Sequence, residues 1–199
     1  MENRVLLMLK IARLAFGAWI LVEILSWAEV LPLTLEFTWL GLILTAGFVW
    51  VSLEIISWQL RKHGARYLWG ITYLGALFSV CADAFGDIFR FYGNFFWYDQ
   101  AAHSIGGAVV ALIAFNLLTA LYQSGKIVLP IKGRGVISVA IAMAMGAFYE
   151  IEEYLEDVFF HSHRLGDGFD TANDLLCNTF GAVVIIIILV IIRRRKKFL

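Results

Sequence analysis

Six long apolar segments constrain this chain more than any other feature of its sequence. They cover about residues 12–32, 38–58, 68–89, 99–121, 135–157 and 173–192. Because a helix rises about 1.5 Å per residue, each segment can cross the roughly 30 Å hydrocarbon core of a bilayer. Only helices and closed barrels satisfy their backbone polar groups inside lipid. The segments therefore predict an all-α, polytopic membrane helix bundle with about six transmembrane helices.

Composition supports a membrane protein and argues against a soluble domain. Of 199 residues, 61% are hydrophobic and 16% are charged, whereas soluble domains carry about 25% charged residues. The first segment has no small-residue cleavage site before Glu23 and Trp27, so we interpret it as a retained span rather than a signal peptide. No linker-like stretch separates the segments, and we expect a single integral membrane domain over residues 1–199.

The basic residues are distributed unevenly along the chain. Of the 16 Lys and Arg residues, 14 lie where six spans would place them on one side of the membrane. These places are the start of the chain up to the first segment, the connections between segments two and three and between segments four and five, and the stretch after segment six. The residues are Arg4, Lys10, Arg13, Arg61, Lys62, Arg66, Lys126, Lys132, Arg134 and residues 193–197. Only Arg90 and Arg164 fall on the other side of a six-span bundle. The positive-inside rule therefore predicts a multi-pass protein of the bacterial inner membrane with both termini in the cytoplasm.

Acidic and polar side chains recur at helical spacing at one end of the last four segments. They form four sets: Asp83 and Asp87; Asp99 and His103; Glu150, Glu153 and Asp157; and Asp170, Asp174 and Asn178. Residues three or four apart share one face of a helix, and the predicted topology places all four sets on the extracytoplasmic side. Ionisable groups in a membrane usually face a partner or a water-filled cavity, because their burial is costly. We therefore expect one outward-facing polar site in the outer half of the membrane.

The chemistry of this site follows from its excess of carboxylates. Carboxylates packed together in a low dielectric cannot all ionise without a cation or bound protons. A divalent metal ion, a relay of protons, and a cationic or polar substrate group remain open as occupants. Carboxylate, imidazole and amide oxygen ligands suit Mg²⁺, Mn²⁺, Ca²⁺, Zn²⁺ or iron. The predicted metal ligands are Glu150, Glu153, Asp174, Asn178 and Asp83.

Asp99 and His103 form the predicted catalytic pair. Their i,i+4 spacing puts both side chains on one helix face, so Asp99 can orient the imidazole ring of His103 as a base or ligand. If the protein is an enzyme, a metal-dependent membrane-embedded hydrolase or transferase is expected. In such an enzyme the metal polarises a phosphoryl or carbonyl oxygen and His103 is the general base.

Four further residues are predicted to bind substrate: Arg164, Asp170, Asp87 and Arg90. Arg164 is one of two cations on the acidic side, and it either pairs with Asp167 or Asp170 or receives a phosphate group. Structural roles are the alternative for the acids at the segment ends, since Asp170 is placed as an ordinary helix N-cap.

The loop between the fifth and sixth segments contains two histidines, His161 and His163, on either side of Ser162. They could hold a metal or an anion, and a solvated loop is the simpler interpretation.

The same polar residues carry a resemblance to known families. The matching stretches are Trp97-Tyr98-Asp99 with His103 and Gly107, residues 149–153 with Asp157, and Asp170-Thr171 with Asp174, Asn178 and Gly181. Over roughly residues 68–185 the chain resembles the YjdF-like family of bacterial membrane proteins. The order of the motifs is also similar to the VanZ-like family, which is linked to teicoplanin resistance, although Gln100 and Glu153 replace its usual lysine and glutamine. The resemblance implies a bacterial membrane bundle whose polar site is formed by these residues.

Three functions are consistent with the sequence. The first is a cation-binding site that acts on, or binds, a lipid-linked or envelope substrate. The second is a proton- or cation-coupled transporter that uses the same carboxylates, and the third is a non-catalytic membrane scaffold. Little beyond Glu23 and Glu54 continues a polar pathway towards the cytoplasm, which favours the one-sided site. Membrane lipids and a lipid-linked substrate are the expected partners, and no nucleic acid is expected.

Overall fold

The computed structural model describes residues 2–64, 68 and 70–195, and this part of the chain contains seven helices and no strand. The helices are α1 (Glu2–Trp27), α2 (Trp39–Lys62), α3 (Gly70–Ile88), α4 (Phe91–Asn94), α5 (Tyr98–Gln123), α6 (Ile131–Phe160) and α7 (Gly168–Arg195). The predicted all-α bundle is confirmed. Three basic residues of the charge pattern, Arg66, Lys196 and Lys197, lie outside the described residues.

Five of the described helices, α2, α3, α5, α6 and α7, are long and apolar enough to cross a membrane. Helix α1 is also long, at 26 residues, and carries Lys10, Arg13 and Glu23; it is not among the five. Helix α4 has only four residues and cannot span. The count of six spans and the cytoplasmic position of both termini stay predictions.

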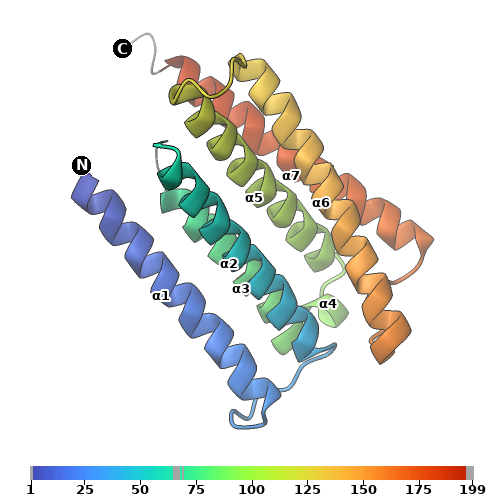
Figure 1. Cartoon of the computed structure of the whole chain (residues 1–199). Helices are drawn as coiled ribbons and strands as arrows, with labels where there is room; N and C mark the ends of the chain where they lie inside the picture. The colour runs from blue at the N-terminus through green and yellow to red at the C-terminus, as the bar shows by residue number, and fades with distance from the viewer. Residues whose placement is uncertain (1, 65–67, 69, 196–199) are drawn as a thin grey trace.

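Consecutive long helices run antiparallel and form two groups, one of α1, α2 and α3 and one of α5, α6 and α7 (Figure 1). Contacts between α3 and α5 join the two groups, and α5 packs most closely against α7. We call the end of the bundle where α1, α3 and α6 begin the basic end, and the opposite end the acidic end. The start of α1 and the end of α7 lie together at the basic end (Figure 1).

Each group of helices has its own apolar core. Phe16, Leu53 and Tyr73 are fully buried between α1, α2 and α3. Phe115 is fully buried between α5, α6 and α7, where its other core neighbours are mostly alanine, valine and isoleucine. Large apolar side chains such as Phe148, which is 63% exposed, cover the outside of the bundle. Because lipid is as apolar as these side chains, close packing must hold the helices together.

Glycines allow that close packing between α5 and α7. A Cβ atom at Gly107 would collide with the main-chain oxygen of Asn178, and one at Gly181 would collide with that of Ser104. The two helices therefore meet backbone to backbone at two levels, as small residues permit in membrane bundles.

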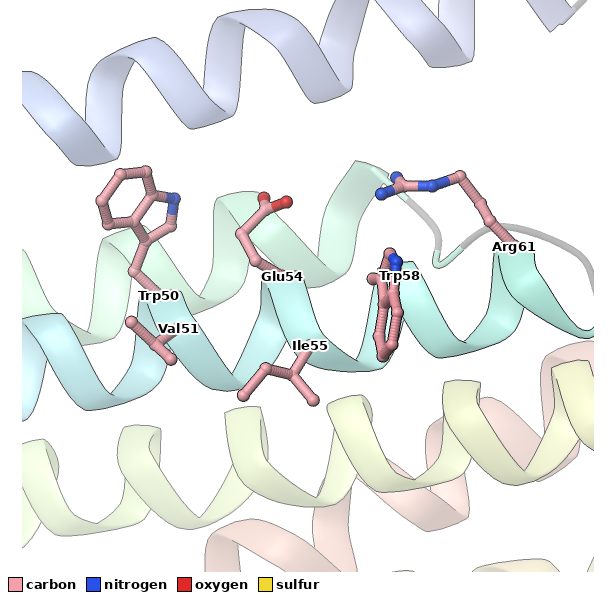
Figure 2. Close-up of a pocket in the computed structure, with 6 residues that line it drawn as sticks. All are labelled: Trp50, Val51, Glu54, Ile55, Trp58 and Arg61. Carbon is pink, nitrogen blue, oxygen red and sulfur yellow. The ribbon is translucent and has the colours of Figure 1, made fainter.

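An ion pair allows the charged helix α1 to pack against α2. The Arg13 guanidinium donates to both carboxylate oxygens of Glu54, at 2.6 and 2.9 Å. Glu54 also lines a groove of about 410 Å³ with Trp50, Val51, Ile55, Trp58 and Arg61. Figure 2 shows Trp50, Glu54 and Arg61 pointing to the side of α2 on which α1 lies. Pairing within this groove neutralises one charge of α1.

We expect Gly181→Ala to destabilise the bundle by about 1–3 kcal/mol, since the added methyl group overpacks a backbone contact. Gly47→Ala is the matched control, because no atom lies within 4 Å of a Cβ at that position. Thermal unfolding of the detergent-purified variants, followed by tryptophan fluorescence, measures the difference. Equal unfolding temperatures for the two variants would contradict the close contact.

Candidate functional site

His103 lies at the centre of the polar cluster at the acidic end. Its side chain is 7% exposed, and its Nε2 atom lies 3.5 Å from Asp99 Oδ1 and 3.8 Å from Asp174 Oδ2. On the other side of the ring, Nδ1 lies 3.9 Å from Glu150 Oε1 and 3.1 Å from Asn178 Nδ2. Helices α5, α6 and α7 thus bring four other predicted site residues to the imidazole of His103.

Glycines on α5 and α6 set the position of Asn178 beside this ring. Gly107 allows the backbone of α7 to approach α5 at Asn178 itself. A Cβ atom at Gly146 of α6 would lie 2.9 Å from Asn178 Nδ2, so the amide fits only because that side chain is missing. Close helix packing therefore orients the amide towards His103.

Two sets of potential ligands share His103. Asp99, His103 and Asp174 form one set, and His103, Glu150 and Glu153 form the other, each with ligand atoms within 4.8 Å of one another. Metal ligands lie about 2.0–2.6 Å from divalent ions, so donor atoms at this separation can reach one ion. Both oxygens of Glu150 and Oδ1 of Asp174 are buried without a hydrogen-bond partner among the described residues. The donor set and these unsatisfied oxygens fit a bound cation.

Arg164, from the connection between α6 and α7, enters the cluster beside His103. Its side chain is 5% exposed, and its guanidinium nitrogens lie 2.9 Å from Asp83 Oδ1 and from Glu153 Oε1. It also donates to the Tyr149 hydroxyl. Although burial alone lowers the pKa of Arg164, the neighbouring Tyr149, Asp83 and Glu153 raise that pKa well above its ordinary value. A permanent positive charge therefore sits between α3 and α6.

Two tyrosines complete the surroundings of Asp83. The Tyr92 hydroxyl donates to Asp83 Oδ1 at 2.7 Å, and the Tyr149 hydroxyl donates to Oδ2 at 3.1 Å. Burial raises the pKa of Tyr92 well above its ordinary value, so this phenol stays a neutral donor. Asp83 thus has partners for both oxygens. Arg164 pairs with Asp83 and Glu153 rather than with the sequence neighbours considered as its partners.

Asp157 organises the loop that carries Arg164. Its oxygens accept hydrogen bonds from the main-chain nitrogens of Arg164 and Leu165, at 2.8 and 3.2 Å. His161 and His163 in this loop are both exposed, with φ angles of 55° and 59°. Asp157 therefore holds the loop, and its two histidines are exposed residues that make no ion pair with the described residues of the cluster.

Asp87 and Arg90, both predicted to bind substrate, have different surroundings. Asp87 is fully buried, and its Oδ1 accepts from the main-chain nitrogens of Glu36 and Phe37, at 2.5 and 2.9 Å. It ties the connection before α2 to the end of α3. Arg90 is exposed, and its side chain makes no ion pair with the part of the chain that the structure describes.

Asp170 lies half-buried in the first turn of α7, above the cluster. It lines a shallow hollow of about 490 Å³ together with Asp167, Phe169 and Asn173. Among the predicted substrate residues, Asp170 is therefore the one that lines this hollow.

Sequence reasoning missed two acids on α6 whose carboxylate oxygens are buried, Glu152 and Glu156. Glu156 is 6% exposed, and neither side chain has a hydrogen-bond partner for its oxygens in the described chain. Glu156 lies against Gly41 in the first turn of α2, where the helix dipole favours a negative charge. Their i,i+4 spacing was a signal that could have identified them.

A protein family described as "predicted membrane protein (DUF2238)" matches residues 11–195 of the chain. The matched residues include every residue of the cluster. This chain belongs to that family. No curated protein and no solved structure matches the chain. Membership of DUF2238 confirms the expected membrane protein family, whereas the YjdF-like and VanZ-like resemblances stay predictions.

Replacing Arg164 should destabilise this DUF2238 protein strongly. Arg164→Gln leaves Asp83 and Glu153 buried without their cation, and breaking a buried ion pair in this way costs about 3–5 kcal/mol. Arg90→Gln is the control, since exposed substitutions usually change stability by about 0.5 kcal/mol or less. Thermal unfolding in detergent measures both. An Arg164→Gln variant as stable as the control would refute the structural role of this guanidinium.

Proposed function

We propose that this protein is a multi-pass bacterial inner-membrane protein that binds a divalent cation at the acidic end and acts on, or binds, a lipid-linked or envelope substrate. The observation that carries the proposal is the set of buried, unpartnered oxygens on Glu150 and Asp174 around His103. A buried carboxylate without a partner is costly. A cation satisfies these oxygens without any change in the helix packing.

The balance of charge supports a cation rather than an anion. The acidic end gathers the carboxylates of Asp83, Asp99, Glu150, Glu153 and Asp174. Arg164 pairs with Asp83 and Glu153 within this set, and its single positive charge compensates one of these two negative charges. The remaining carboxylates surround one imidazole, which carries at most a single positive charge. A divalent ion therefore compensates negative charge that the cationic groups of the cluster do not compensate.

Asn178 and Asp99 would set the chemistry of the imidazole. The oxygen and nitrogen of an Asn amide exchange places by a simple flip. With its oxygen accepting from Nδ1–H, Asn178 directs the Nε2 lone pair of His103 towards Asp99 and Asp174, which suits Nε2 as a metal ligand beside Asp174 or as a general base. In the opposite tautomer Asn178 Nδ2 donates to Nδ1, and Asp99 orients the ring by accepting from Nε2–H. A bound metal would supply a Lewis acid for a phosphoryl or carbonyl oxygen.

Exposed aromatic residues support access from the lipid. Phe95, Phe96 and Trp97 come just before α5 at the acidic end, and they are 44%, 91% and 52% exposed. Aromatic side chains of this kind favour the membrane–water interface. Their position beside Asp99 supports a substrate that is held in the membrane, and the VanZ-like resemblance, with its link to an envelope-directed antibiotic, agrees with such a substrate.

Removing a ligand should remove the metal. We expect wild-type protein, purified in neutral detergent and dialysed against a mixture of divalent ions, to retain about one equivalent of metal. Asp174→Asn and Glu150→Gln should weaken retention at least tenfold, because each removes a buried charge from the ligand set. Asp167→Asn, on the exposed loop, is the control. Elemental analysis that finds the same metal content in all four proteins, or none in the wild type, would disprove the cation site.

A second function, proton- or cation-coupled transport, is favoured by buried polar groups nearer the basic end. The Tyr73 hydroxyl lies 2.5 Å from Ser57 Oγ and 3.3 Å from Glu54 Oε1. The Asn116 amide donates to Thr72 Oγ1 at 2.6 Å. Of the two acids that the sequence offered for a pathway, Glu54 lies in this region, whereas Glu23 lies near the end of α1 at the acidic end. The further polar groups therefore extend the polar interior towards the basic end.

Flux through liposomes distinguishes the two functions. A transporter should dissipate a pH or cation gradient across proteoliposomes, and Asn116→Leu should slow the flux at least tenfold because it removes a buried polar group from the pathway. The metal content of Asn116→Leu should equal that of the wild type. A pH-sensitive dye inside the liposomes measures the flux. Wild-type protein that leaves the gradient intact would contradict transport and favour the one-sided site.

A further inference from the structure

Arg134 is a buried cation without a carboxylate partner at the basic end. Its side chain is 6% exposed, and its Nε and Nη1 atoms are buried with no hydrogen-bond partner among the described residues. The guanidinium lies over two rings of α5, 4.3 Å from the centroid of Tyr122 and 6.0 Å from that of Phe115. These aromatic contacts favour a cation, but they leave the N–H groups of Nε and Nη1 unsatisfied.

The sequence offers no acid near Arg134 on the helices that surround it. There is no Asp or Glu between Asp99 and Glu150, and none after Asp174. Both Asp99 and Glu150 lie at the acidic end, and helices α5, α6 and α7 therefore supply no carboxylate at the basic end. On α2, Glu54 is engaged with Arg13. A counter-anion for Arg134 must come from outside these helices.

Two neighbouring features also favour an anion at this place. Arg193 of α7 lies over the same Phe115 ring, with its guanidinium carbon 5.7 Å from the centroid. Arg134 itself is in the first turns of α6, whose N-cap residue is Pro130 and whose first amides receive no side-chain cap among the described residues. Free amides and the positive end of the helix dipole attract anions such as phosphate.

We propose that Arg134 and the start of α6 bind the phosphate group of a membrane phospholipid. The planar guanidinium of arginine matches a phosphate with two parallel hydrogen bonds. Apolar side chains beside the site are open to lipid: Tyr122 is 44%, Val128 98% and Val136 71% exposed. These side chains provide a surface for the acyl chains, while the headgroup phosphate satisfies Arg134. The site lies at the opposite end of the bundle from the proposed cation site and does not depend on it.

The proposal is tested with the full chain and phosphatidylglycerol in neutral detergent. Native mass spectrometry measures binding of the lipid, and thermal unfolding measures the stability that it adds. Wild-type protein should bind phosphatidylglycerol and gain thermal stability from it. Arg134→Met should bind it at least tenfold more weakly and gain no stability. Without lipid this variant should fold as well as the wild type, because replacing a buried unpaired charge with an apolar side chain is neutral or stabilising. Lys126→Gln, at an exposed cation of the same end, is the matched control.

Further ligands identify the source of the phosphate. Diacylglycerol, which has the chains without the phosphate, should give neither binding nor stabilisation. Inorganic phosphate that stabilises the wild type but not Arg134→Met would support the site while assigning it to soluble phosphate. Arg134→Lys, which keeps the charge but not the planar fork, should bind phosphatidylglycerol more weakly than the wild type. Equal binding of phosphatidylglycerol by wild type, Arg134→Met and Arg134→Lys would overturn the proposal, as would equal binding of diacylglycerol.

Discussion

The pairing of one guanidinium with a buried and a partly buried carboxylate stabilises the acidic end of this bundle. Charges in a low dielectric are tolerated only when each has a partner. Arg164 provides that partner for Asp83 on α3 and Glu153 on α6, and so joins the two helical groups. It leaves Glu150 and Asp174 unsatisfied on the other side of the cluster. The same ion pairs that stabilise the fold therefore define which carboxylates remain for a ligand.

Helix packing and site geometry depend on the same small residues. Gly107 and Gly181 allow α5 and α7 to touch along their backbones, and Gly146 gives the amide of Asn178 its space. If these helices moved apart, Asn178 and Asp174 would both leave His103, because they lie one turn apart on α7. In a membrane bundle, where close packing replaces the hydrophobic effect, the contact that holds the helices is also the contact that orients the site.

Helical spacing predicted much of this arrangement from the sequence, since residues four apart must share a face. It placed Asp99 with His103, and Asp174 with Asn178, before any packing was considered. It could not assign Arg164 to Asp83, because those residues are 81 positions apart and only the folded loop brings them together. Asp87 looked like a site residue by spacing, yet it accepts from the main chain of a distant connection. Sequence spacing predicts which residues share a face of a helix, whereas tertiary packing determines which side chains on other elements they contact.

Helix α6 illustrates why an acid-rich stretch is difficult to interpret. Its acids fall on two faces: Glu150 and Glu153 face His103 and Arg164, whereas Glu156 faces the first turn of α2. A periodicity argument selects one stripe and overlooks the other. At the basic end the opposite situation holds, since a single buried arginine has aromatic neighbours and no acid on its helices. The two ends thus carry unbalanced charge of opposite sign, and this is the common basis of the cation proposed at the acidic end and the lipid phosphate proposed at the basic end.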